Sequence, residues 1–222
     1  MSKKRKNNKS IDSYALFLAN CRTKPLIKLK NIKKLSYGNE RMNKLEFLDF
    51  IKEHYGFEGF HHYTDFNNFV CILKAGYLYS RKKAEEFGFI DAADQNVLRR
   101  TRGAIKTYVR FYYKEKTPTL YKNEGILPNE PEYQMPLPVL LLFDEKIILR
   151  KSTYISSGGC GNPNTEYSRY AKKFSRFDWP VIFSRCAIPR YGNGIVSVFG
   201  DENGSSISNK RNAEFLYPSA IM

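Results

Sequence analysis

The spacing of the apolar residues changes part-way along this chain of 222 residues, and that change constrains the fold most. In the first half apolar residues recur at helical spacing, which predicts helices at residues 11–21, 43–55, 65–76 and 91–102. Later apolar runs are short or alternate with polar residues, which predicts strands at residues 107–113, 137–143, 146–149, 180–184 and 194–199. Helices that precede strands, instead of alternating with them, predict an α+β fold.

Capping residues define the ends of two of these helices. Helix 65–76 has Asp65 in position to cap its N-terminus and Gly76 to stop it, and helix 43–55 ends at Gly56. Polar, turn-forming residues then predict two long loops, at residues 156–165 and 200–210.

Positive charge is concentrated near the N-terminus. The chain has 37 Lys and Arg against 22 Asp and Glu, and the first 52 residues hold 14 of the former and 4 of the latter. We expect residues 1–10 to be disordered, and the excess charge favours a polyanionic partner, most simply nucleic acid. The alternative is a basic tail that only keeps the protein in solution.

Several classes of protein are disfavoured. The chain has no run of eighteen apolar residues and no secretory signal, which argues against a membrane partner. It also lacks a P-loop, a Rossmann glycine motif, a nucleophile elbow and a zinc-protease motif. Its four cysteines form no C-x-x-C pair and it has three histidines, so we expect no metal, and free thiols in the cytoplasm.

Three separated blocks carry the candidate functional residues. The first, His62, Thr64 and Asn68, places hydrogen-bonding groups where a strand runs into a helix, a location that suits a ribose or phosphate. A histidine there is also compatible with a satisfied core residue.

The second block interleaves basic and aromatic side chains, as a groove that stacks bases and neutralises phosphates would. It contains Arg99, Arg100, Arg102, Arg110, Lys116 and Tyr121. The alternative is a half-buried strand with polar partners.

The third block begins with Lys210 and Arg211 and places Glu214 at the start of an apolar strand, directly after the second loop. A glutamate in this position is also compatible with a solvated residue or an ion-pair partner. We expect its substitution to leave the fold intact, because a strand-start glutamate beside a polar loop rarely supports a core.

Together the blocks resemble the DarT family of NAD-dependent nucleic-acid ADP-ribosyltransferase toxins over residues 60–217. The matching motifs are His62-x-Thr64 with Asn68, Ile72 and Leu73, then Tyr108 to Tyr113 with Pro118-Thr119-Leu120-Tyr121, then Gly158-Gly159-x-Gly161-Asn162, and Ala213-Glu214-Phe215-Leu216. The chain departs from the family at Arg110, where proline is common, and at Thr119, where methionine is common.

The resemblance implies an ADP-ribosyltransferase-like split β-sheet core at residues 58–222, preceded by a basic N-terminal extension of tail and helices at residues 1–57. It implies transfer of ADP-ribose from NAD to a base of single-stranded nucleic acid, DNA first and RNA next, without a metal. It also implies a toxin with an antitoxin partner, or an anti-phage role. Two alternatives remain: an ADP-ribosyltransferase that acts on protein, and a basic nucleic-acid-binding protein without enzymatic activity.

The resemblance also implies roles for single residues. The expected catalytic residues are Glu214, which would stabilise the oxocarbenium-like ribose, and Arg100, which would pair with the pyrophosphate or orient the acceptor. The expected NAD-binding residues are His62, Thr64, Asn68, Arg99 and Arg102. The expected nucleic-acid-binding residues are Arg110, Lys116, Tyr121, Lys210 and Arg211.

Overall fold

The computed structural model describes residues 43–222 except 90, 92–94, 124–134, 136, 185–186, 191–193 and 198–203. The tail and the helix predicted at residues 1–21 lie outside this part. The centre is a six-stranded antiparallel sheet with the strand order β4-β1-β3-β9-β5-β6. Its strands are β1 (Phe60–Asp65), β3 (Tyr108–Tyr112), β4 (Pro138–Phe143), β5 (Tyr154–Ser156), β6 (Tyr167–Ser168) and β9 (Glu214–Pro218).

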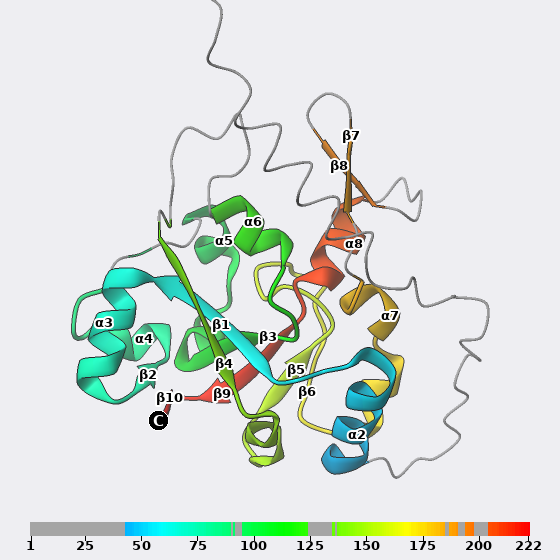
Figure 1. Cartoon of the computed structure of the whole chain (residues 1–222), viewed down its shortest axis with the longest axis horizontal. Helices are drawn as coiled ribbons and strands as arrows, with labels where there is room; N and C mark the ends of the chain where they lie inside the picture. The colour runs from blue at the N-terminus through cyan, green and yellow to red at the C-terminus, as the bar shows by residue number, and fades with distance from the viewer. Residues whose placement is uncertain are drawn as a thin grey trace, which may run out of the picture.

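Helices cover the sheet and its ends. In Figure 1, α3 and α4 lie at one end of the sheet, α2 and α7 at the other, and α8 leads into β9. The helices are α2 (Lys44–Tyr55), α3 (Phe66–Ala75), α4 (Arg81–Ala84), α5 (Gln95–Arg100), α6 (Pro118–Asn123), α7 (Trp179–Ile182) and α8 (Gly204–Arg211), with 3-10 turns η2 (Gly103–Thr107), η3 (Glu145–Leu149) and η4 (Ala171–Arg176). Two small sheets pair β2 (Leu78–Tyr79) with β10 (Ala220–Ile221), and β7 (Ala187–Arg190) with β8 (Gly194–Ser197).

The main core lies on one face of the sheet. Alternate residues of β3 and β9, including Phe111 and Phe215, pack there with Phe60 of β1. Helix α2 covers this face through Phe47, whose ring lies 4.8 Å from that of Trp179. The last helix of the predicted extension therefore packs against the same core as the sheet, and the domain boundary after residue 57 stays a prediction.

Strands β1 and β3 share a short pairing. Strand β1 pairs with β4 along its whole length, from Phe60↔Phe143 to Asp65↔Pro138, but with β3 only at His61↔Tyr112. The sheet therefore opens between β1 and β3 on the Asp65 side of this pair.

The α+β class and the two capped helices agree with the sequence predictions. Asn43 begins α2 in a capping box with Glu46, and Asp65 caps α3 by accepting from the Asn67 amide at 2.8 Å. Gly56 and Gly76 end these helices in the left-handed conformation that glycine adopts without strain.

Four predicted segments are wrong in type or length. The predicted strand 146–149 is the 3-10 turn η3, because Asp144 caps the Lys146 amide at 2.7 Å. The predicted strand 180–184 overlaps helix α7, in which Pro180 occupies the first turn that proline favours. The helix predicted at 91–102 spans Gln95–Arg100, and the loop predicted at 200–210 contains α8.

Among the described residues, no helix combines the length and apolar character that a membrane-spanning segment needs.

Candidate active site

Glu214 is the first residue of β9, and its carboxylate is almost fully buried, with 1% of the residue exposed. Arg110 on β3 forms a bidentate ion pair with the carboxylate, donating from Nε to Oε2 and from Nη2 to Oε1, the latter at 2.6 Å. The backbone amide of Cys160 also donates to Oε1, at 2.9 Å. Glu214 is therefore an ion-pair partner, one of the alternatives left open by its sequence position. The expectation that this glutamate does not support a core is wrong, because its side chain is buried.

Strand register brings these groups together. Tyr112 pairs with Glu214 and Arg110 with Leu216, so Arg110 and Glu214 are diagonal neighbours on the face opposite the main core. A second, small apolar cluster lies on this face, with Leu216, Ile105 and Cys160 at its centre. The acid thus sits in a dry environment, which strengthens its interaction with any positive charge.

The glycine-rich loop supplies the third contact. Ser156 Oγ accepts from the Glu214 amide at 2.8 Å and lies 2.6 Å from the Gly158 carbonyl oxygen. A Cβ on Gly158 would lie 2.4 Å from Asn209 Nδ2, so only glycine lets the loop approach α8 this closely. Asn209 Oδ1 also accepts from the Gly159 amide at 3.0 Å. The loop is therefore a fitted part of the site that aims the Cys160 amide at Glu214.

The Cys160 side chain contributes no nucleophile. Burial, followed by the nearby Glu214 charge, raises the pKa of its thiol. The thiol therefore stays protonated at neutral pH, and it is the backbone amide of this residue that contacts the acid.

Two tyrosines border the site. The rings of Tyr63 and Tyr112 stack with centroids 5.0 Å apart, and the Tyr63 hydroxyl donates to that of Tyr112 at 3.1 Å. Burial raises the pKa of Tyr63 to about 12, so both partners of this hydrogen bond stay neutral. Both tyrosines lie in the quoted sequence blocks, but neither was predicted as a site residue, although strand alternation puts Tyr112 on the same face as Arg110.

His62 connects β1 to β3 beside the gap in the sheet. Its Nδ1 lies 2.9 Å from the Arg110 carbonyl oxygen. A carbonyl only accepts, so Nδ1 carries the proton. Burial lowers the pKa of His62, which keeps the ring neutral at pH 7 and leaves Nε2 as an acceptor. This tautomer suits a ribose hydroxyl donor.

We expect stability to fall in mild acid because of His62. Its pKa is lowered by folding, so the unfolded chain binds more protons and stability is lost as pH falls below about 6.5. The loss reaches at most about 1.4 kcal/mol per histidine at pH 5.5. Urea unfolding of His62→Gln between pH 7.5 and 5.5 should show a shallower pH slope than the wild type.

His61, whose pKa burial also lowers, should behave in the same way. If stability changes with pH equally for the wild type and for His62→Gln, the inference that folding keeps the His62 ring neutral would be contradicted.

The other predicted NAD-binding residues, and the predicted catalytic Arg100, follow His62 in the chain. Thr64 is buried in β1 two residues further on, and Asn68 is in the first turn of α3. Arg99 and Arg100 end α5 with exposed side chains, and the exposed Arg102 precedes η2. Because α5 stops at Arg100, Arg99 and Arg102 do not belong to one helix, and the single helix predicted for residues 91–102 does not hold all three arginines.

Two predicted nucleic-acid-binding residues lie three and four residues before Glu214 in the sequence. Lys210 and Arg211 are in the last turn of α8, and Lys210 forms an ion pair with Asp178 at 2.9 Å. Their roles as DNA contacts stay predictions.

Of the remaining three residues of this group, Arg110 pairs with Glu214 as described above, and the other two follow β3. Lys116 is exposed in the connection after the strand, and Tyr121 lies in α6. This segment joins the end of α8 through Asn212, whose Oδ1 accepts from the amide and the hydroxyl of Thr119 at 3.0 and 2.9 Å. The segment after β3 and the segment before β9 are therefore neighbours.

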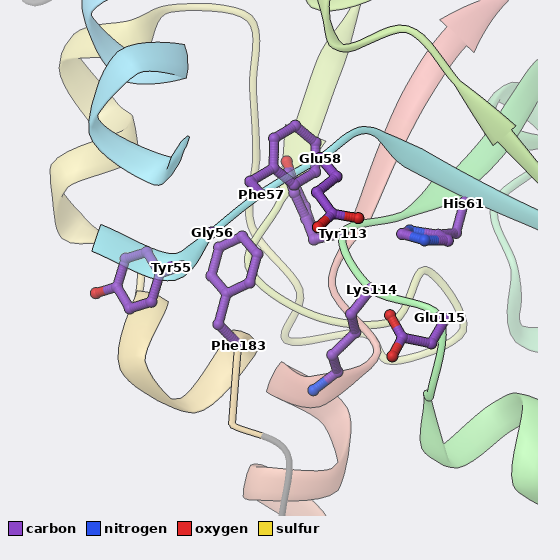
Figure 2. A pocket seen from close by; sticks show the side chains of 9 residues that line it. All are labelled: Tyr55, Gly56, Phe57, Glu58, His61, Tyr113, Lys114, Glu115 and Phe183. Carbon is purple, nitrogen blue, oxygen red and sulfur yellow. The ribbon is translucent and has the colours of Figure 1, made fainter. Parts of the chain in front are cut away.

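A separate pocket lies where α2 ends and β3 ends. Figure 2 shows the Glu58 and Glu115 carboxylates, His61 and Lys114 around it, with the rings of Tyr55 and Phe183 to one side. None of the predicted site residues lines it. In the described part of the chain, no three His, Cys, Asp or Glu side chains gather closely enough to hold a metal ion.

Comparison with protein families identifies one match. The family model described as ssDNA thymidine ADP-ribosyltransferase, DarT, matches residues 61–222. A search of curated proteins finds no match.

Solved structures with the same fold include three DarT complexes. Thermus sp. 2.9 DarT in complex with ADP-ribosylated ssDNA is 17% identical, with a TM-score of 0.55 over 74% of this chain and 76% of that chain. The same enzyme in complex with NAD+ gives a TM-score of 0.51 with the same identity and coverage. Thermosipho africanus DarTG in complex with ADP-ribose is 16% identical, with a TM-score of 0.52 over 74% of this chain and 41% of that chain. The predicted ADP-ribosyltransferase-like core is thereby confirmed.

Proposed function

The chain belongs to the DarT family of ssDNA thymidine ADP-ribosyltransferases, and we propose that it transfers ADP-ribose from NAD to the thymine base of a thymidine in single-stranded DNA. The observation that carries this proposal is the buried Glu214 carboxylate at the start of β9, which accepts from the Cys160 amide of the glycine-rich loop. Such a group can stabilise a positively charged ribose where water is excluded.

The chemistry divides into two bond changes. The bond between the ribose C1′ and the nicotinamide nitrogen breaks, its electron pair leaves with nicotinamide, and the ribose gains oxocarbenium character. A base nitrogen then bonds to C1′ and loses its proton. Glu214 is the proposed group that holds the ribose hydroxyl, stabilises the charge and accepts that proton.

Other residues have proposed binding roles. His62, Thr64, Asn68, Arg99 and Arg102 would hold NAD, with the neutral His62 accepting from a ribose hydroxyl at Nε2. Lys116, Tyr121, Lys210 and Arg211, with the basic N-terminal segment, would follow the DNA backbone, where each phosphate contact adds salt-dependent affinity. An unpaired thymine reaches the site without the cost of flipping it from a duplex.

The biological part of the proposal is a toxin that acts in the cytoplasm, with an antitoxin partner or a role against phage. The family resemblance supports it, as does the fold likeness to Thermosipho africanus DarTG. RNA is the second candidate substrate, because the basic N-terminal segment could follow either backbone.

Labelled NAD tests the function directly. The purified chain is incubated separately with single-stranded DNA, single-stranded RNA and a protein mixture. We expect label on thymidine-containing DNA, and none on the same oligonucleotide with cytidine at every thymidine. Label on protein alone would support the protein-modifying alternative. Salt-sensitive DNA binding without any NAD turnover would support the non-enzymatic one.

The arginines at the end of α5 and just after it, Arg99, Arg100 and Arg102, should differ in whether they affect the rate or the binding. We expect Arg100→Ala to lower single-turnover transfer about 100-fold with saturating oligonucleotide, because it removes a charge from the developing transition state. Arg99→Ala and Arg102→Ala should mainly raise the NAD concentration needed for half-maximal rate, because both residues are proposed to hold NAD. Wild-type single-turnover rates for all three variants would leave the cluster as a solvated basic surface.

A further inference from the structure

Arg110 occupies much of the hydrogen-bonding capacity of the Glu214 carboxylate. A carboxylate offers about four lone-pair positions, and Arg110 takes two of them while the Cys160 amide takes a third. The Glu214 side chain is 1% exposed, whereas that of Arg110 is 26% exposed. Arg110 is therefore the more exposed member of the pair, whereas the carboxylate itself has almost no contact with solvent.

This arrangement conflicts with the chemistry proposed for Glu214. The acid has to place its negative charge beside a ribose that becomes positive, and to accept a hydroxyl hydrogen bond. A guanidinium gripping both oxygens neutralises that charge and repels the positive ribose. The described geometry is therefore that of a closed carboxylate, and the reaction requires Arg110 to move.

The substrates carry the group that would move it. A guanidinium fork fits a phosphate as well as a carboxylate, through two parallel N–H···O bonds. NAD brings a diphosphate and DNA brings backbone phosphates, so either substrate can exchange a phosphate for the carboxylate as the partner of Arg110. The exchange keeps the arginine paired and frees Glu214.

We propose that Arg110 is a positioning residue that acts as a phosphate-displaced latch: it caps Glu214 until a substrate phosphate draws its guanidinium away. This inference rests on the proposed function. The DarT family commonly has proline at this position, so the latch is a property of this chain rather than of the family pattern.

The test measures binding without turnover. Calorimetry gives the affinities of ADP, adenosine and a thymidine-containing single-stranded decanucleotide for the wild type, Glu214→Gln, Arg110→Gln and the double variant. The latch predicts that Glu214→Gln binds ADP or the oligonucleotide about 10-fold more tightly, since no carboxylate competes for the guanidinium. Arg110→Gln should bind the same ligand about 10-fold more weakly, and adenosine affinity should not change.

The double variant separates a latch from simple removal of negative charge. If Glu214 weakens phosphate binding only through its charge, Glu214→Gln will tighten binding equally with and without Arg110. The latch predicts no tightening once Arg110 is absent. Arg110→Lys, which keeps the charge but loses the fork, should fall between wild type and Arg110→Gln.

A second forked pair provides the matched control. Arg81 binds both oxygens of Asp91, at 3.0 and 2.5 Å, and its side chain is 20% exposed. Arg81→Gln removes a comparable pair outside the site and should leave all three affinities unchanged.

The outcome identifies the phosphate source. Coupling seen with ADP assigns the displacing group to NAD, and coupling seen with the oligonucleotide assigns it to DNA. Equal tightening with and without Arg110, or the same change for adenosine as for ADP, would overturn the latch. A wild-type protein that transfers ADP-ribose but shows no coupling would lose only the latch, whereas absence of transfer would remove the proposed function itself.

Discussion

Glu214→Gln is expected to lower ADP-ribose transfer by at least about 1,000-fold, because it removes the charge proposed to stabilise the ribose and the group proposed to accept the proton. Glutamine keeps the shape of the side chain and can still accept from the Cys160 amide. Transfer is measured with labelled NAD and a thymidine-containing oligonucleotide under single-turnover conditions. A glutamine variant that transfers at the wild-type rate would rule out this catalytic assignment.

Stability has to be measured on the same variant. Removing one partner of a buried ion pair typically costs about 3–5 kcal/mol, and Arg110 would lose its carboxylate. The partial exposure of Arg110 should reduce that cost, because water can replace part of the lost interaction. Glu145→Gln, which breaks the surface pair with Lys52, is the control for loss of an ion pair elsewhere. The activity result counts only at temperatures where the thermal unfolding curve shows a folded variant.

Phe215→Ala is expected to reduce the free energy of unfolding by about 3–5 kcal/mol, the usual cost of removing a fully buried phenylalanine ring. Phe215 has no exposed surface, and its ring stacks on that of Phe60 with centroids 4.1 Å apart. It also contacts Phe111 on the neighbouring strand. Urea unfolding at pH 7.5 measures the change.

Leu142→Ala provides the comparison, since Leu142 lies in the same sheet but is 58% exposed. Leu142→Ala should reduce the free energy of unfolding by less than about 1 kcal/mol. If Phe215→Ala costs no more than Leu142→Ala, the aromatic cluster does not stabilise the sheet as we describe. Because Phe215 follows Glu214 directly, its loss should also lower transfer.

Helices whose ends are marked by capping residues could be predicted from the sequence more accurately than the short apolar segments. Asp65 and Gly76 mark the ends of α3 through contacts within one turn of the chain, so the pattern carries the information. Segments such as Ile147–Leu149 hold too few residues to distinguish period two from period three or four. Their conformation depends on capping residues and on packing, which the apolar pattern does not encode. In this segment the Asp144 side chain caps the 3-10 turn η3.

The candidate site was predicted residue by residue but not as a set of contacts. Glu214 and Arg110 were both singled out, with Arg110 expected to contact nucleic acid. Their pairing depends on the register between two strands 104 residues apart, which no local pattern encodes. The contribution of the Cys160 amide could not be predicted at all, because any residue type supplies a backbone amide.

The position of β9 affects when the enzyme can first exist. This strand is the last of the six to be synthesised, yet it lies between β3 and β5 near the middle of the sheet. Until it emerges from the ribosome, β3 and β5 lack their shared neighbour, and Glu214, the proposed catalytic acid, is missing. Pairing over such a sequence separation is intrinsically slow. The sheet of a nascent chain therefore stays incomplete until synthesis has passed Pro218, and no earlier fragment can hold Glu214 between Arg110 and the Cys160 amide.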